Sequence, residues 1–130
     1  MAWYVDTSAF LKLVVEEEHS AALREWAEAN EKSLFSSDLM RVEALQSARR
    51  HSPAALAATR DRLDAVALLT VGRAAYDMAA ALDPAILRTL DALHLSVALG
   101  VGNNLEGVVT YDLRLASAAA LFGVAVATPK

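Results

Sequence analysis

The stretch Ala2-Trp3-Tyr4-Val5-Asp6-Thr7-Ser8-Ala9-Phe10 decides the fold of this chain. Its first four residues are apolar and rich in aromatic and β-branched side chains, which predicts a short buried strand. The apolar run ends on a carboxylate, Asp6, and two hydroxyl residues then open a helical pattern. In an open α/β sheet, ligands bind at the carboxyl ends of the strands. Asp6 is therefore a candidate ligand-binding residue, and other acids that converge on it would define a site.

The length and composition indicate a small α/β protein. The chain has 130 residues, the size of a single domain, and it is 55% hydrophobic but only 6% aromatic. Ala, Leu and Val therefore supply most of the core, which favours helices that cover a small sheet. A net charge of −4 argues against nucleic-acid binding through bulk basic charge. Divalent ions bound at an acidic site would nevertheless reverse the local charge.

The sequence predicts a cytoplasmic protein without membrane contact. Its N-terminus lacks the basic segment of a signal peptide, and its longest uncharged run, residues 115–129, is shorter than the roughly 20 residues of a membrane span. The absence of cysteine excludes disulfides, zinc-thiolate sites and thiol nucleophiles, and it fits a reducing compartment. The mean hydropathy of +0.31 is high for a monomer and predicts that a partner or a second copy covers apolar surface.

Short apolar runs alternate with helical patterns along the whole chain. The predicted strands cover residues 2–5, 33–36, 68–71, 107–110 and 124–127. This alternation favours β-α-β crossovers and therefore a mostly parallel sheet with helices on both faces, in one domain over residues 1–130. In the helix predicted to begin at Ser37 or Asp38, residues Leu39, Val42, Glu43 and Gln46 share one face, which we expect to point inward.

Four of the 16 acidic residues stand where solvated acids are not expected: Asp6, Glu43, Asp91 and Asp112. Asp6 and Asp112 follow apolar strands, and Glu43 borders an apolar helical stripe. Asp91 interrupts the helix predicted from Ile86 to Val101, which is apolar nearly all round and should therefore be buried.

Each of these acids has a structural alternative when it is taken alone. Asp6 and Asp112 belong to one of the best residue types for a helix N-cap. Asp91 could pair with Arg88 or His94, each three residues away on the same helix face. The remaining acid could be the solvated flank of its helix. Several carboxylates in one cleft, however, repel one another unless a cation holds them.

Sites built only from oxygen ligands select hard ions such as Mg²⁺ or Mn²⁺. Four carboxylates suit one or two such ions, which polarise a phosphate, lower the pKa of an attacking water and shield the leaving oxygen. The acids therefore indicate phosphodiester hydrolysis. His94 is interpreted as a packed or hydrogen-bonded histidine rather than a ligand. The sequence contains no Ser-His-Asp order, glycine-rich phosphate loop or zinc spacing.

Four blocks of the sequence resemble the PIN-domain ribonucleases and, within them, the VapC-type toxins of type II toxin-antitoxin systems. They are VDTSAFLKL (5–13), RVE (41–43), LRTLDALHL (87–95) and VTYDLRL (109–115). Their order and separations are typical of the family, so the resemblance covers nearly the whole chain. It implies a PIN-like three-layer sandwich whose five-stranded, mostly parallel sheet has the first strand in its centre, beside the fourth.

The resemblance also implies roles for individual residues. It makes four acids both the catalytic and the metal-binding set, with Mg²⁺ or Mn²⁺ as the ion: Asp6, Glu43, Asp91 and Asp112. It places three hydroxyls near the metal-bound water or the phosphate: Thr7, Ser8 and Thr110. It offers four cations for RNA contact: Arg114, Arg88, Arg41 and Lys12. Some relatives carry a further acid shortly after the Asp112 position, where Leu115 and Ala116 stand here, so the number of ions remains open.

The function that this resemblance implies is endonucleolytic hydrolysis of RNA by the toxin of a toxin-antitoxin pair. Such proteins form homodimers and are neutralised by a small VapB-like antitoxin that covers the active-site groove. We therefore expect a homodimer or a toxin-antitoxin hetero-oligomer. Two alternatives use the same site: a structure-specific DNA nuclease and a catalytically idle PIN-type binding module. A phosphate-receiving signalling domain fits less well, because it needs adjacent acids where Asp6 stands alone.

Overall fold

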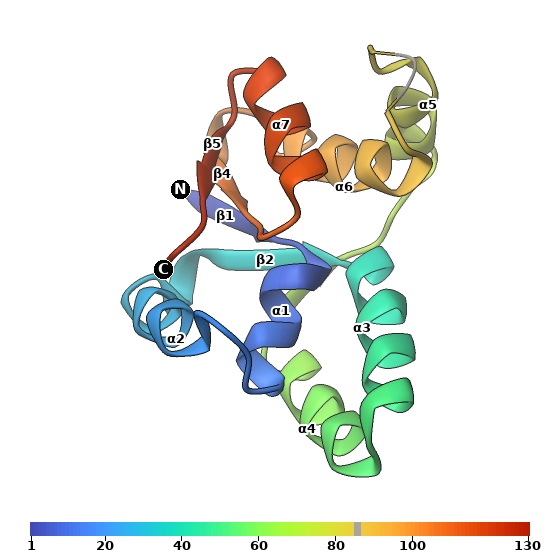
Figure 1. Cartoon of the computed structure of the whole chain (residues 1–130). Helices are drawn as coiled ribbons and strands as arrows, with labels where there is room; N and C mark the ends of the chain where they lie inside the picture. The colour runs from blue at the N-terminus through green and yellow to red at the C-terminus, as the bar shows by residue number, and fades with distance from the viewer. Residues whose placement is uncertain (85–86) are drawn as a thin grey trace.

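The computed structural model describes residues 1–84 and 87–130 of the chain (Figure 1). The strands are β1 (Ala2–Val5), β2 (Leu34–Ser37), β3 (Ala67–Leu69), β4 (Leu105–Val109) and β5 (Ala125–Ala127). The helices are α1 (Thr7–Val14), α2 (Ser20–Ala29), α3 (Asp38–His51), α4 (Pro53–Leu63), α5 (Arg73–Ala81), α6 (Thr89–Leu99) and α7 (Leu113–Leu121). The predicted elements are confirmed to within a few residues. The predicted start of the buried helix at Ile86 lies outside the described residues.

The five strands form one parallel sheet in the order β3-β2-β1-β4-β5. The central position of β1 and its pairing with β4 are confirmed. The chain moves outward from β1 to β2 and β3, and then returns to β4 on the opposite side of β1. Such a reversal of strand order leaves a crevice at the carboxyl ends of the two neighbouring strands. Asp6 lies at this point, where its N–H donates to the carbonyl oxygen of Val109 at 3.2 Å.

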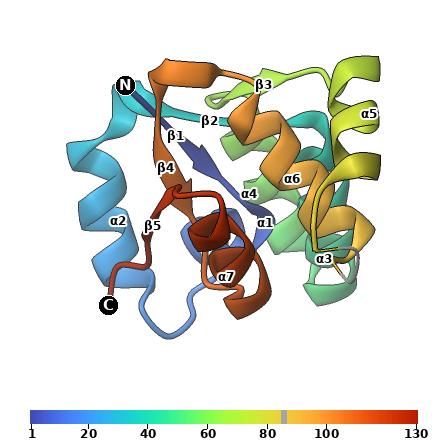
Figure 2. The same cartoon turned by 90° about the horizontal axis from the view of Figure 1, so that it is seen from above.

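Helices cover both faces of the sheet, so the molecule has the three layers that the sequence predicts (Figures 1 and 2). One face carries α1 to α4, and the other carries α6 and α7, with α5 packed against α6. Successive side chains of a strand point to opposite faces. Tyr4 therefore packs in the core beneath α6 and α7, whereas Val5 packs in the core beneath α1 to α4. Val108 and Val109 of β4 divide in the same way.

Helix α3 turns a different stripe inward from the one that its sequence predicts. Met40, Ala44 and Ala48 are buried, whereas Val42 is 49% exposed. The prediction was wrong because it favoured large apolar side chains, while α3 packs against α1 and α4 through small alanines that allow close approach. Glu43 nevertheless lies at the border of the buried face. In α6, the predicted burial is confirmed, because every residue from 91 to 98 is buried.

Large apolar side chains remain on the surface, as the mean hydropathy indicates. The most exposed are Met1, Leu113, Leu121, Tyr76, Val42 and Leu90. Such side chains are available to a protein partner. Among the described residues, none of the helices combines the length and the apolar character that crossing a membrane requires.

Gly107 of β4 occupies a position that only glycine fits. It pairs with Trp3 on one side and Ala125 on the other. A Cβ atom at this position would overlap the Ala125 carbonyl and the Trp3 ring. We expect Gly107→Ala to lower the free energy of unfolding by about 1–3 kcal/mol, the usual cost of overpacking, in urea denaturation.

Gly72→Ala is the matched control for this substitution. Nothing lies within 4 Å of an added Cβ at Gly72, and its φ of −101° suits any residue. Equal stability of the Gly107→Ala variant and the parent would contradict the close packing of β1, β4 and β5.

Candidate active site

The four acids identified from the sequence line one cleft at the carboxyl ends of β1 and β4. The cleft has a volume of about 510 Å³. Asp6 follows β1, Glu43 comes from α3, Asp91 lies in the first turn of α6, and Asp112 is the N-cap residue of α7. Figure 1 shows the ends of these elements grouped around the end of β1. Four separate segments of the chain therefore bring carboxylates to one place.

Asp6 is buried at the N-terminus of α1 and only 4% exposed. One carboxylate oxygen, Oδ1, accepts hydrogen bonds from the Ala9 N–H at 3.0 Å and from Ser8 Oγ at 2.8 Å. The other, Oδ2, accepts from Thr110 Oγ1 at 2.5 Å. Burial raises the pKa of Asp6, and these donors offset the effect only in part. A cation in the cleft would favour the ionised carboxylate.

The N-cap alternative for Asp6 and Asp112 is correct for both residues. Asp6 caps α1 through Ala9, and Asp112 Oδ1 accepts from the Arg114 N–H at 2.8 Å. A cap uses only part of the acceptor capacity of a carboxylate, which has about four lone-pair sites. Capping therefore fixes the position of each carboxylate and remains compatible with a second role in the cleft.

The three hydroxyls singled out by the sequence hold the carboxylates. Ser8 and Thr110 donate to Asp6, whereas Thr7 Oγ1 donates to Glu43 Oε1 at 2.7 Å. Ser8 Oγ also accepts from the Tyr111 N–H at 2.9 Å, which ties α1 to the end of β4. In this structure the hydroxyls orient acidic groups, and contact with a metal-bound water or a phosphate remains a prediction.

Glu43 is anchored by a chain of hydrogen bonds that begins in the core. His94 Nε2 lies 2.6 Å from Glu43 Oε1, and His94 Nδ1 lies 2.6 Å from the hydroxyl of Tyr4. The Tyr4 hydroxyl in turn lies 2.8 Å from Ser37 Oγ. Because an ionised carboxylate only accepts, His94 Nε2 is the donor to Glu43. The interpretation of His94 as a hydrogen-bonded residue is confirmed.

Two opposing effects set the charge state of Glu43. Burial raises the pKa of Glu43, but the hydrogen bond and charge of His94, with the hydroxyl of Thr7, outweigh it and leave the pKa below its usual value. Glu43 is therefore favoured as an anion. The sequence did not reveal the Tyr4–His94–Glu43 chain, because its members come from β1, α6 and α3.

Arg88 is the counter-ion of the other two acids. Its Nε donates to Asp91 Oδ2 at 3.0 Å, and one of its terminal nitrogens lies 3.5 Å from Asp112 Oδ2. The Asp91 side chain is 6% exposed and that of Arg88 is 53% exposed, so the pair lies at the mouth of the cleft. The hydrogen bond and charge of Asp91 raise the pKa of Arg88. The pairing of Asp91 with Arg88, which the sequence suggested, is confirmed. The second contact of Arg88, with Asp112, was not predicted because it forms only when the chain folds.

The acids and hydroxyls of the cleft offer only oxygen atoms as metal ligands, and such a ligand set suits a hard divalent cation. Within residues 1–84 and 87–130, however, no three His, Asp or Glu side chains are grouped closely enough to hold a metal ion together as they stand. Arg88 engages Asp91 and Asp112, and His94 engages Glu43. Joint coordination by these acids would therefore require them to draw together and exchange Arg88 for the ion.

The remaining cations considered for RNA contact lie outside the cleft. Arg41 and Arg114 are exposed, and neither lines the cleft. Lys12 donates to the backbone carbonyl of Glu18 at 3.0 Å, and its Nζ lies 4.9 Å from the centre of the Tyr111 ring. Lys12 therefore ties α1 to the loop that follows it.

The hydrogen-bond chain behind Glu43 predicts a stability change. We expect Tyr4→Phe to lower the free energy of unfolding by about 1–3 kcal/mol, because buried groups of Ser37 and His94 lose their partner. Tyr76→Phe is the control, since this side chain is 54% exposed and its loss should change stability by less than about 0.5 kcal/mol. Chemical denaturation of both variants measures the difference, and equal stabilities would rule out the chain.

Comparison with known proteins places the chain in a family. The PIN domain matches residues 3–121. Ribonuclease VapC46 of Mycobacterium tuberculosis (strain ATCC 25618 / H37Rv) is 39% identical over 128 residues, covering 98% of each chain. Ribonuclease VapC47 of Mycobacterium tuberculosis (strain CDC 1551 / Oshkosh) is 35% identical over 130 residues, covering 97% of this chain and 96% of the relative.

A solved structure shares the whole fold. The crystal structure of VapC20 from Mycobacterium tuberculosis, a sarcin-ricin loop cleaving toxin, superposes with a TM-score of 0.77 at 18% identity, covering 98% of this chain and 100% of that one. The predicted PIN-like architecture and the family resemblance are both confirmed. This chain therefore belongs to the PIN-domain family, as one of its VapC-type members.

Proposed function

We propose that this chain is an endoribonuclease that hydrolyses RNA phosphodiester bonds with Mg²⁺ or Mn²⁺ and acts as the toxin of a toxin-antitoxin pair. The observation that carries the proposal is the convergence of four acids in one cleft. Carboxylates brought together in this way need cations to offset their repulsion. The relatives VapC46 and VapC47, which are named ribonucleases and align over nearly the whole chain, support the same activity.

In the proposed mechanism, four acids would hold the ion or ions: Asp6, Glu43, Asp91 and Asp112. An ion held there would supply polarisation of the scissile phosphate and activation of the attacking water. Ser8 and Thr110 keep the Asp6 carboxylate in place. Thr7 and His94 hold Glu43 in the same way. These contacts fix the acids before substrate arrives, which reduces the reorganisation that the reaction requires.

Arg88 has two roles in this proposal. Without a metal it neutralises Asp91 and Asp112. After it exchanges with the ion, its guanidinium is free to bind a phosphate oxygen, a group that arginine recognises well. Arg114, exposed on α7 beside Asp112, is proposed as a further phosphate contact.

We also propose that a small VapB-like antitoxin covers the cleft and that the protein works in the cytoplasm, as a homodimer or a toxin-antitoxin hetero-oligomer. Apolar side chains at the cleft support such a contact. Leu90 lines the cleft and is 48% exposed. Leu113 and Leu121 line an adjoining groove of about 450 Å³ and are 83% and 70% exposed.

Metal-dependent cleavage tests the proposed activity. We expect the purified chain, freed of any antitoxin, to cut single-stranded RNA with Mg²⁺ or Mn²⁺ and to stop with EDTA. Asp6→Asn and Asp91→Asn should abolish cleavage while circular dichroism shows an intact fold, because each removes a carboxylate charge from the cleft. Asp61→Asn on the exposed face of α4 is the control and should cut as the parent does.

The same assay separates the alternatives. If Asp6→Asn cuts as fast as the parent, the assignment of the site is wrong. Cleavage of structured DNA in place of RNA would favour the DNA nuclease. A folded parent chain that cuts neither nucleic acid with metal present would favour the idle binding module.

The pairing of Arg88 predicts competition with metal. We expect Arg88→Gln to tighten Mn²⁺ binding by about two- to fivefold in isothermal titration calorimetry, in line with the modest strength of exposed ion pairs. Arg73→Gln removes an equally exposed charge from α5, which does not border the cleft, and should leave the affinity unchanged. Unchanged or weaker Mn²⁺ binding by Arg88→Gln would contradict the exchange of Arg88 for the ion.

A further inference from the structure

Arginines are concentrated on the hairpin of helices α3 and α4. These helices, residues 38–63, hold five arginines and three acids, although the whole chain has 16 acidic and only 12 basic residues. The arginines are Arg41, Arg49, Arg50, Arg60 and Arg62, and all are exposed. Among the described residues none of them forms an ion pair, whereas Lys12, Arg24 and Arg88 do. The five arginines outnumber the three acids of these helices by two, and none of the five lies within ion-pair distance of a described carboxylate.

The arginine surface begins at the cleft. Glu43, in the second turn of α3, lines the cleft, and Arg50, seven residues later, lies about two turns further along the same side of the helix. Arg49 and Arg50 follow Glu43 by six and seven residues, which is about 9–11 Å further along the helix axis. Helix α4 packs beside α3 and adds Arg60 and Arg62 to the same hairpin.

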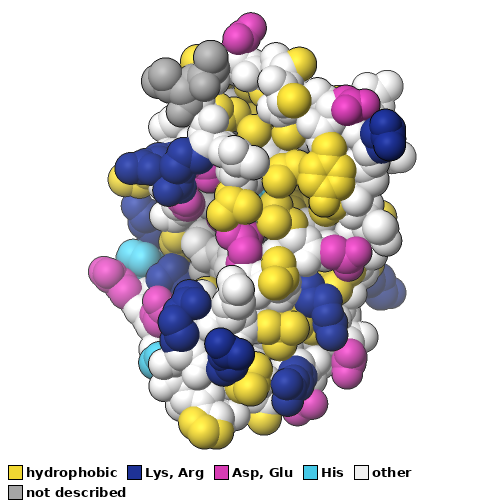
Figure 3. Space-filling model, turned by 90° about the vertical axis from the view of Figure 1, so that its right-hand side faces the viewer, with side chains coloured by type: hydrophobic (Ala, Val, Ile, Leu, Met, Phe, Trp, Pro, Cys, Tyr) yellow, Lys and Arg dark blue, Asp and Glu magenta, His cyan; other side chains and the backbone are white. Residues whose placement is uncertain are grey.

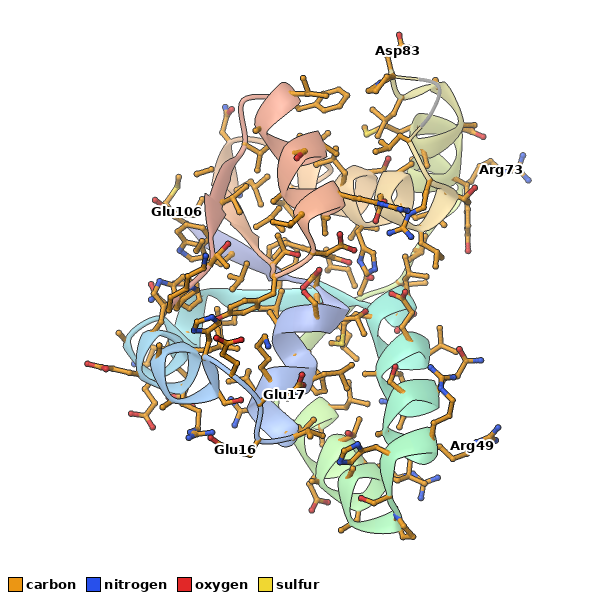
Figure 4. The ribbon with its side chains drawn as sticks, in the orientation of Figure 1. Glu16, Glu17, Arg49, Arg73, Asp83 and Glu106 are labelled. Atoms are coloured by element: carbon orange, nitrogen blue, oxygen red, sulfur yellow. The ribbon has the colours of Figure 1, made fainter. Side chains whose placement is uncertain are left out.

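The figures show that this charge is open to solvent. In Figure 3 several basic groups gather on the lower half of the face, below the acidic groups at its centre. In Figure 4 Arg49 projects outward from α3, away from the rest of the molecule. The only hydrogen bond of the Arg50 side chain among the described residues is a 3.3 Å contact with Ser47. Long, exposed arginine side chains of this kind are free to contact an extended polyanion.

We propose that the exposed arginines of α3 and α4 bind the phosphate backbone of the RNA strand on one side of the cleavage site. This inference rests on the proposed function. Basic grooves that follow the backbone are the common means of binding single-stranded nucleic acid, and arginine-phosphate contacts position the strand without reading its sequence. The net charge of −4 excludes attraction by the whole surface, so a local basic surface must supply it. Under the proposed function the scissile strand enters the carboxylate cleft and continues on either side of it, which favours RNA on the neighbouring arginine surface; an acidic protein segment is the competing occupant.

Salt-dependent RNA binding tests the inference separately from cleavage. The affinity for a labelled single-stranded RNA is measured by fluorescence anisotropy over a range of salt concentrations, in the Asp6→Asn background and again with the parent chain in EDTA. We expect Arg49→Gln/Arg50→Gln to bind more weakly and to reduce the slope of log K against log salt by about 1.4, since each phosphate contact of a single strand contributes about 0.7.

The matched control removes the same charge elsewhere. Lys32→Gln/Arg73→Gln takes one cation from the turn after α2 and one from α5, both exposed and outside the α3–α4 hairpin. Its RNA affinity and salt slope should equal those of the parent. Both double variants therefore remove two positive charges, and they differ only in where those charges lie.

Each outcome decides the inference. Weaker binding confined to the Arg49→Gln/Arg50→Gln variant, with a parent that cleaves RNA, supports it. If the two double variants bind RNA alike while the parent still cleaves, the inference is overturned and the proposed function stands. If the parent neither binds nor cleaves RNA, both are wrong, and the arginine surface serves another partner.

Discussion

The mutual repulsion of four carboxylates at one end of the sheet is the constraint on which the polar structure of this protein depends. Three kinds of group hold the four acids. Asp6 accepts from two hydroxyls and a backbone N–H, Glu43 is bound by His94, and Arg88 lies between Asp91 and Asp112. Hydrogen bonds orient the acids, and among the described residues only Arg88 brings a permanent positive charge into the cleft. A divalent ion would supply that charge more strongly, which links the architecture to metal-dependent chemistry.

Much of the fold is predictable because local sequence patterns indicate where the strands of the sheet lie. Apolar runs of three to five residues mark the strands, and the abrupt change from Val5 to Asp6 marks the end of the central one. The family resemblance added the strand order, which local patterns do not contain. The prediction that was wrong, the inward face of α3, depends on packing between segments. The inward face of α3 is lined by Ala44 and Ala48, whose small size matters only against α1 and α4.

In the site, too, local sequence patterns predicted some features, whereas others depend on contacts between distant segments. Asp6, Glu43, Asp91 and Asp112 stood out because each interrupts or borders an apolar segment, and the structure brings all four to one cleft. The pairing of Arg88 with Asp91 was predicted, but its contact with Asp112 was not, because Arg88 and Asp112 are 24 residues apart and meet only when α6 and α7 pack on the sheet. Net charge does not describe how the charges are distributed. An acidic chain still carries an unpaired arginine surface on α3 and α4, so the distribution of charge says more about RNA than its sum.

The most direct test of the central claim is the position of the metal itself. Anomalous diffraction from crystals grown with Mn²⁺ locates the ion without reference to activity. We expect the strongest peak in the cleft, in contact with the Asp6 carboxylate, with Arg88 withdrawn from Asp91 and Asp112. A cleft without an anomalous peak at saturating Mn²⁺, or an ion bound elsewhere while Arg88 keeps both aspartates, would contradict the account.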